Sequence, residues 1–177
     1  MFAAFCRSYR KFAFARKASA AVEFGLVAAP FFAVLIALFQ TAMVFFAGRV
    51  LDVTTLQASR YILTGQAQNA SYTQSQFATY VCNNSFALFN CNNLMINVNT
   101  YSSFSSAVTT APTLTYNSKG QVTNSWSYSP GGPNDIVVVQ VMYQWPVMLG
   151  PLGFNLSNLS NGDRLLMSTV VFKNEPY

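Results

Sequence analysis

The most apolar stretch of the chain lies close to its amino terminus, at residues 18–47. It contains a single charged residue, Glu23, and a single amide, Gln40. A helix needs roughly 20 apolar residues to cross a bilayer, and a lone segment satisfies its backbone hydrogen bonds in lipid only as a helix. The pattern therefore predicts a transmembrane helix at residues 19–47, with Pro30 inside it.

The helical pattern continues beyond the apolar stretch, into residues 48–66. No proline interrupts them, and Gly65 is a typical stop signal. Apolar side chains recur there every three to four residues, which predicts one stripe along a helical stalk. The stripe consists of Val50, Val53, Leu56 and Leu63, with Arg60 at the same spacing. We therefore expect one helix over residues 19–64 to carry both the membrane segment and the stalk.

Residues 67–177 have the pattern of a small mixed domain. A short helix is predicted at residues 74–81. Strands are predicted at residues 94–101, 136–147 and 165–173, and weaker edge strands at 113–116 and 122–126. We expect an α+β fold in which an antiparallel sheet packs on the apolar stripe of the stalk.

Charge is distributed unevenly along the chain, whose net charge is +5. Half of the ten basic residues precede the apolar stretch with no acid among them, namely Arg7, Arg10, Lys11, Arg16 and Lys17. By the positive-inside rule, residues 1–18 form a cytoplasmic arm near lipid headgroups and the part after residue 47 is exported. The exported part has no cluster of basic residues, which argues against nucleic acid as a partner.

A conventional cleaved signal peptide does not fit this amino terminus. The apolar run is about twice the usual length of a signal's apolar region. The small-residue triplet Ala18-Ser19-Ala20 also precedes the run, whereas a signal-peptide cleavage site follows it.

The three cysteines divide between the two sides of the membrane segment. Cys82 and Cys91 lie nine positions apart in the exported part, whereas Cys6 lies in the arm. This division predicts a Cys82–Cys91 disulfide and leaves Cys6 as a free thiol. Two unrelated buried cysteines remain the alternative.

The composition argues against catalysis. The chain has no histidine, which removes the commonest general base and metal ligand. The exported acids Asp52, Asp135, Asp163 and Glu175 are scattered, and no zinc, calcium or phosphate-binding spacing occurs. We expect no enzyme activity, no cofactor and no metal site, with a paired-carboxylate hydrolase as an alternative.

Four aromatic residues of the exported part, Trp126, Tyr128, Tyr143 and Trp145, are candidates for binding sugar or peptide. The competing interpretation, that they fill a small core, is favoured.

Glu23 is the candidate functional residue of the membrane segment. A carboxylate within lipid costs about 3 kcal/mol, and such residues usually mark function. Two interpretations stay open. Glu23 lies at the headgroup boundary near Lys17, or its charge is recognised by a processing enzyme or by the amino terminus of another subunit.

Several motifs follow one another along the chain. They are residues 18–24 (ASAAVEF), 26–30 (LVAAP), 57–60 (QASR), 64–68 (TGQAQ), 130–139 (PGGPNDIVVV), 164–166 (RLL) and 172–177 (FKNEPY). In this order they resemble TadE-like proteins, the minor pseudopilins of the tight-adherence (Flp-type) pilus system.

The resemblance implies cleavage by a prepilin peptidase between Ala18 and Ser19, which makes Glu23 the fifth mature residue. The family usually has glycine before the cut, where this chain has Ala18. The resemblance also implies that Glu23, with Phe24 beside it, contacts other subunits. A buried acid is tolerated when it meets a cation, here the amino terminus of a neighbouring subunit.

The partners implied are other pilus subunits and pseudopilins, the prepilin peptidase, the inner-membrane assembly platform and membrane lipid. We expect a minor pseudopilin or pilus-assembly component that crosses the bacterial inner membrane once, with its amino terminus in the cytoplasm and its domain in the periplasm. The alternative is an uncleaved bitopic membrane protein whose periplasmic domain binds a ligand or peptidoglycan.

Overall fold

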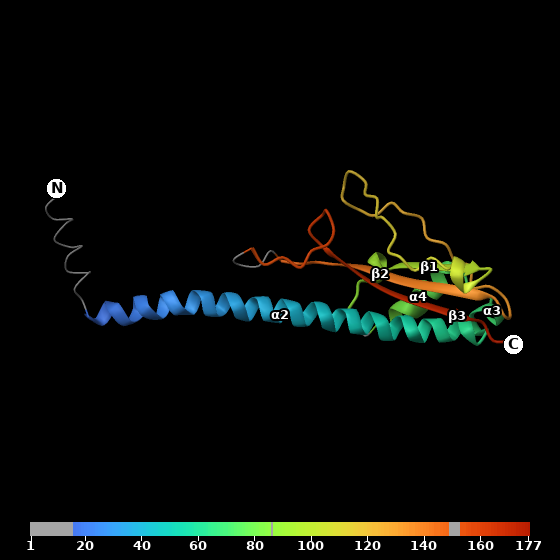
Figure 1. The fold of residues 1–177 in the computed structure, drawn as a ribbon, viewed down its shortest axis with the longest axis horizontal. Helices are drawn as coiled ribbons and strands as arrows, with labels where there is room; N and C mark the ends of the chain where they lie inside the picture. The colour runs from blue at the N-terminus through green and yellow to red at the C-terminus, as the bar shows by residue number, and fades with distance from the viewer. Residues whose placement is uncertain (1–15, 86, 149–152) are drawn as a thin grey trace. The chain divides into compact units, whose positions relative to one another are not determined.

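The computed structural model describes residues 16–85, 87–148 and 153–177, with side chains from residue 20 onward. Within these ranges the chain is α+β, with a long amino-terminal helix followed by a small domain that holds a three-stranded antiparallel sheet (Figure 1). The chain divides into two compact units. One takes in residues up to Thr41 and Leu149–Asn155, and the other Ala42–Met148 and Leu156–Tyr177. The greater part of the predicted arm, including Cys6, lies outside the described residues.

Helix α2 (Arg16–Leu63) has 48 residues and continues through Pro30. A proline removes one backbone hydrogen bond, a loss that helices in apolar surroundings tolerate. The helix ends just before Gly65, whose φ of 72° lies in the left-handed region that glycine adopts at no steric cost. The single helix predicted over residues 19–64 is thereby confirmed.

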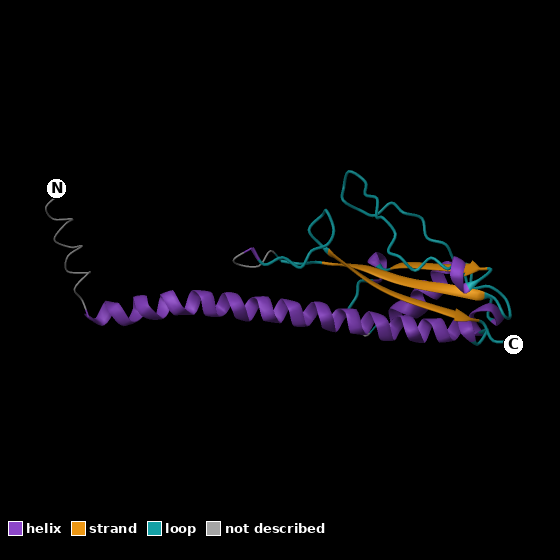
Figure 2. Cartoon of the chain, viewed as in Figure 1, coloured by secondary structure: helices purple, strands orange, loops and turns teal. Residues whose placement is uncertain are grey.

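The sheet has the strand order β1 (Met95–Tyr101), β2 (Ile136–Trp145) and β3 (Arg164–Lys173) (Figure 2). Both pairings are antiparallel, and Val139 at the centre of β2 lies opposite Val98 of β1 and Val170 of β3. The strands begin and end within two residues of the predicted positions. β2 ends before Pro146, because proline has no N–H to donate to a neighbouring strand.

One face of the sheet packs on the second segment of α2, which we define as residues 42–63, and on α4 (Gln74–Asn83). The core there includes Ala47, Leu51, Ala58 and Ile62 of α2, Phe77 and Val81 of α4, and Ile96, Val98, Val137, Val139, Val141 and Leu166 of the sheet. Helix α4 confirms the helix predicted at 74–81. It begins at a capping box, in which the Thr73 side chain accepts from the Gln76 N–H and the Gln76 side chain accepts from the Thr73 N–H.

The face of α2 that enters this core is not the predicted stripe. Val53 is 45 % and Leu56 52 % exposed. The buried positions are instead Val44, Ala47, Leu51, Thr54, Thr55, Ala58, Ser59 and Ile62. Most of these side chains are small, which lets the helix lie close to the sheet, and their hydroxyls bond within the helix, as where Ser59 Oγ donates to the Thr55 carbonyl at 2.7 Å. Val50 of the predicted stripe packs partly buried against this core, whereas Val53 and Leu56 are exposed. The predicted stripe is therefore mostly wrong in phase, because the close contact between helix and sheet accommodates small side chains better than large ones.

Residues 102–134 cover part of the opposite face of the sheet. The Gln140 side chain donates to the Thr110 carbonyl at 3.2 Å, and the Gln144 side chain donates to the Tyr116 hydroxyl at 2.8 Å. These two bonds tie the covering segment to β2.

The two edge strands predicted at 113–116 and 122–126 do not form, and a single bridge joins Tyr116 to Val122. The Asn124 side chain accepts the Thr115 N–H at 2.8 Å, so a side chain takes the place of a backbone partner. A second isolated bridge sets Tyr128 beside Val98, along the outer edge of β1.

Candidate membrane and assembly segment

The first segment of α2, which we define as residues 20–41, presents large apolar side chains on all sides. Phe24 and Leu26 are each 72 % exposed, and most of the other large apolar residues of this segment are exposed as well. The helix is long and apolar enough to cross a membrane, and none of its most apolar 18-residue window is buried. An apolar surface of this extent needs lipid or other protein around it.

The predicted processing and contact residues lie together at the start of α2. Ala18 and Ser19 fall in its first turn, and Glu23 and Phe24 follow about one turn later. Glu23 is exposed, and it is the only acid that the sequence places between residues 18 and 47. The negative charge thus lies at the amino-terminal end of the apolar surface.

Gly25 follows directly after these residues. A Cβ placed on Gly25 would meet no atom within 4 Å, so this chain's own packing does not require glycine there. Glycine within a helix costs about 1 kcal/mol relative to alanine. Small residues in membrane helices allow another helix to come close.

The predicted Cys82–Cys91 disulfide is present, with the two Cα atoms 5.5 Å apart. It joins the last turn of α4 to the short helix η1 (Cys91–Asn93), which leads into β1. The bridge thereby fixes the loop that connects the helical layer to the sheet.

Three of the motifs that carried the resemblance meet at the carboxyl end of α2, namely residues 64–68, 130–139 and 172–177. The Gln68 side chain donates to the Pro130 carbonyl at 3.0 Å, and the Asn174 side chain donates to the same carbonyl at 2.9 Å. The Gly132 N–H in turn donates to the Asp135 carboxylate at 2.8 Å. Sequence reasoning did not predict that these motifs touch.

The carboxyl-terminal tail completes this cluster. The Glu175 N–H donates to the Leu63 carbonyl at 2.9 Å, which satisfies one of the carbonyls that the end of a helix leaves without a partner. Gly65 faces the ring of Tyr177, and a Cβ at that position would overlap the ring. The tail therefore holds the end of the stalk against the domain.

The four candidate aromatic residues divide between the two interpretations. Tyr143 is buried, and Tyr128 and Trp145 pack partly buried against the core, whereas Trp126 lines a surface pocket. Across the described ranges, no three His, Cys, Asp or Glu side chains come together as a group able to hold a metal ion.

Comparison with known proteins gives a match at the segment described above. The family model described as TadE-like protein matches residues 18–60. Over this segment the chain is TadE-like. The resemblance inferred from the motifs at residues 18–30 and 57–60 is confirmed over this segment, and the family it matches is that of components associated with the Tad pilus system. TadE-like pilus components are generally structural proteins and not enzymes. Neither the curated proteins nor the solved structures contain a significant match.

The TadE-like match extends from the predicted cleavage position to the last turn of α2, and ends before the tail cluster. It includes both the exposed apolar segment and the buried one. A single apolar helix of this kind is consistent with single-pass anchoring in a membrane.

Proposed function

We propose that this protein is a minor pseudopilin of a Tad pilus, anchored by α2 and acting through contacts with other pilus subunits. The observation that carries the proposal is the coincidence of two features at residues 18–60. The TadE-like match covers the segment in which a helix exposes a continuous apolar surface with one acid at its start. The prepilin peptidase and the inner-membrane assembly platform are the further partners of this proposal.

The proposed topology places residues 1–18 in the cytoplasm, residues 19–47 in the inner membrane and the stalk and domain in the periplasm. The basic residues before the apolar segment support this orientation. The Cys82–Cys91 disulfide supports it independently, because such bonds persist in the periplasm and are rare in the cytoplasm.

The proposed role of Glu23 is to receive the amino terminus of a neighbouring subunit. Cleavage between Ala18 and Ser19 creates a new ammonium group at the membrane surface. A carboxylate and an ammonium that lose water together stabilise each other only as a close pair, so the pairing fixes the offset between adjacent helices. The open space at Gly25 gives a second helix room to approach at this level.

Mass spectrometry of the mature amino terminus tests the proposal. We expect a protein that begins at Ser19 in cells that assemble pili, and faster processing in an Ala18→Gly variant. An intact leader in piliated cells would contradict the proposal and favour the uncleaved bitopic membrane protein.

Substitutions of two acids on the same helix test the ion pair. Glu23→Gln and Glu23→Ala should impair piliation while membrane insertion is retained. Asp52→Asn is the matched control, because Asp52 makes an exposed bridge to Arg49 at 3.4 Å, of the kind worth at most about 1 kcal/mol. Normal pili in both Glu23 variants would contradict the pairing.

A further inference from the structure

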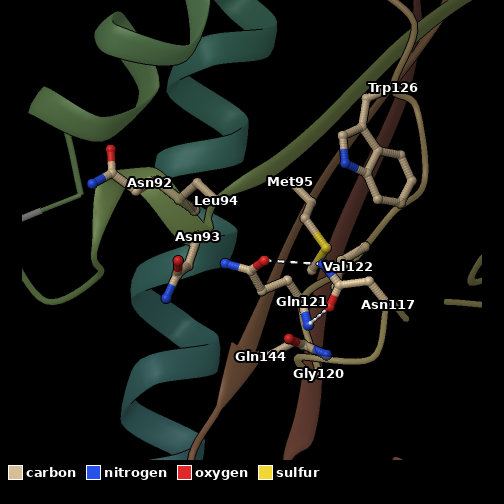
Figure 3. Close-up of a pocket in the computed structure, with 10 residues that line it drawn as sticks. All are labelled: Asn92, Asn93, Leu94, Met95, Asn117, Gly120, Gln121, Val122, Trp126 and Gln144. Atoms are coloured by element: carbon tan, nitrogen blue, oxygen red, sulfur yellow. Dashed lines mark hydrogen bonds between the residues drawn. The ribbon is translucent and has the colours of Figure 1, made fainter. Parts of the chain in front are cut away.

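A polar pocket opens on the surface of the domain, and none of its lining residues belongs to the helix that carries the TadE-like match. Its volume is about 580 Å³, within the range of roughly 300–1,000 Å³ typical of small-molecule sites. Its walls come from three stretches of chain, which are η1 with the start of β1, residues 117–126, and the end of β2 (Figure 3). No motif in the sequence predicts that these three stretches meet.

The lining has an unusual composition. It contains the five amide side chains Asn92, Asn93, Asn117, Gln121 and Gln144, together with the indole of Trp126. None of the lining residues is ionisable. A lining of this kind offers many hydrogen bonds and provides no charge to attract an ion.

Several amides in the pocket are already oriented and still have bonding capacity. Gln121 accepts the Asn117 amide at 3.0 Å, which leaves its own NH₂ as a donor. Gln144 donates to Tyr116, which leaves its carbonyl oxygen as an acceptor. The Asn93 side chain makes no hydrogen bond within the described residues.

The backbone around the pocket is also held in place. The disulfide fixes the start of η1, and the Asn90 side chain accepts the Asn92 N–H at 3.1 Å. On the opposite wall, the Gln74 side chain of α4 donates to the Trp126 carbonyl at 2.9 Å. A site whose groups are positioned in advance loses less entropy when a ligand binds.

We propose that this pocket binds a neutral oligosaccharide. Sugar hydroxyls both donate and accept hydrogen bonds, as side-chain amides do. The C–H face of a sugar ring is apolar and packs on a broad aromatic face such as that of Trp126. The absence of ionisable lining residues disfavours phosphorylated or acidic sugars.

An extended peptide is the less favoured ligand. Peptides commonly bind by adding a strand to a free sheet edge. Near the pocket, part of the outer edge of β1 is already occupied, because the Val98 N–H donates to the Ser127 carbonyl at 2.9 Å and the Val98 carbonyl accepts the Ser129 N–H at 2.8 Å. The inference does not depend on the proposed role in the pilus.

Fluorescence titration of the full chain in phospholipid vesicles, which add no tryptophan of their own, tests this site. Maltoside detergents are avoided because their headgroup is itself a neutral sugar. The chain has two tryptophans, so a Trp145→Phe background leaves Trp126 as the only indole. We expect a saturable change in emission with chitotriose or maltotriose at concentrations up to about 10 mM, which covers weak millimolar binding.

Two variants and a matched control assign the binding to the pocket. Asn93→Ala and Gln121→Ala should each weaken sugar binding about fivefold, as expected for one lost hydrogen bond. Asn93 is exposed and without a side-chain bond in the described residues, so its substitution leaves the fold intact. Gln57→Ala removes an exposed amide on α2 and should leave the affinity unchanged.

Three results would overturn the proposal. The first is the absence of a saturable response to either sugar, and the second is equal affinity in Asn93→Ala and in the parent protein. The third is tighter binding of a trialanine peptide than of both sugars.

Discussion

The two segments of α2 have the same secondary structure and opposite relations to their surroundings. In residues 20–41 the large apolar side chains are exposed, as at Leu26, which is 72 % exposed. In residues 42–63 the residues that face the domain are mostly alanine, threonine and serine, with Leu51 only 1 % exposed. The more apolar segment is thus the exposed one, and the less apolar segment forms the core.

This difference shows that side-chain size follows the kind of contact each segment makes. Against a sheet of the same chain, small residues shorten the distance between layers, and their hydroxyls are satisfied by the helix's own carbonyls. Against lipid no close fit is required, and large side chains give the greatest gain per residue, at about 25 cal/mol per Å² of apolar surface removed from water. Matched residues from the two segments should therefore respond differently to the same substitution.

The largest expected effect comes from truncating one leucine in each segment. Leu51→Ala removes a buried side chain from the core and should lower the free energy of unfolding of the domain by about 2–5 kcal/mol. Leu26→Ala should leave that free energy unchanged, because Leu26 makes no contribution to the core. Urea unfolding of both variants in nanodiscs, followed by near-ultraviolet circular dichroism, measures the difference. Equal destabilisation would contradict the division of α2.

Enlarging an alanine in each segment tests the close approach of helix and sheet. Ala58 is 1 % exposed in the core, so Ala58→Leu should destabilise the domain by about 1–3 kcal/mol through overpacking. Ala29 is exposed, and Ala29→Leu should have no effect on unfolding measured in the same way. A stable Ala58→Leu variant would mean that the helix can move away from the sheet at little cost.

Much of this fold could be predicted because its strands and its helix have strong local patterns. The alternation of apolar and polar residues in β1 and the run of β-branched residues in β2 predicted both strands, and Gly65 predicted the end of α2. The phase of the stalk was not predictable from hydrophobicity, because Val53 and Leu56 are larger than the alanine and serine residues that the sheet selects. The edge strands at 113–116 and 122–126 failed because side chains such as Asn124 replace backbone partners.

The functional sites were predictable only where their residues lie close together in the sequence. The TadE-like segment is continuous in sequence, so its motif at residues 18–30 is readable without a structure. The pocket and the tail cluster are built from residues far apart in the chain, such as Asn93 with Gln144 and Gln68 with Asn174. Only folding brings them together.

The second segment should also respond to alkaline pH through the aromatic residues beside it. The ring of Tyr128 packs on Phe77 at 5.3 Å between centroids. Burial raises the pKa of the Tyr128 hydroxyl to about 12, and the electrostatic repulsion from Tyr61 and Tyr72 adds a smaller part of that increase. In the unfolded chain a tyrosine titrates near pH 10, so between about pH 10 and 12 unfolding releases a proton and the stability of the domain falls as pH rises.

Tyr128→Phe should remove this part of the pH dependence. The Tyr128 hydroxyl is buried without a hydrogen-bond partner among the described residues, so the variant should be at least as stable as the parent at pH 7. The free energy of unfolding at pH 8 and at pH 11 measures the effect. Tyr101→Phe is the control, because Tyr101 does not belong to the group formed by Tyr128, Phe77, Tyr61 and Tyr72. An equal loss of stability in the parent and in Tyr128→Phe would contradict the assignment.

The smallest effect concerns the threonines that both segments contain. Thr55 and Thr41 each donate to the carbonyl four residues earlier, Thr55 to Leu51 at 2.7 Å and Thr41 to Ala37 at 2.8 Å. Thr55→Val exchanges one such bond, worth about 1 kcal/mol, for a buried methyl group worth about 0.8 kcal/mol, so unfolding should change by less than about 1 kcal/mol. Thr41→Val should leave unfolding unchanged and strengthen membrane insertion slightly. A loss above about 2 kcal/mol in Thr55→Val would show that the hydroxyl, and not the size of the side chain, is what this position of the core requires.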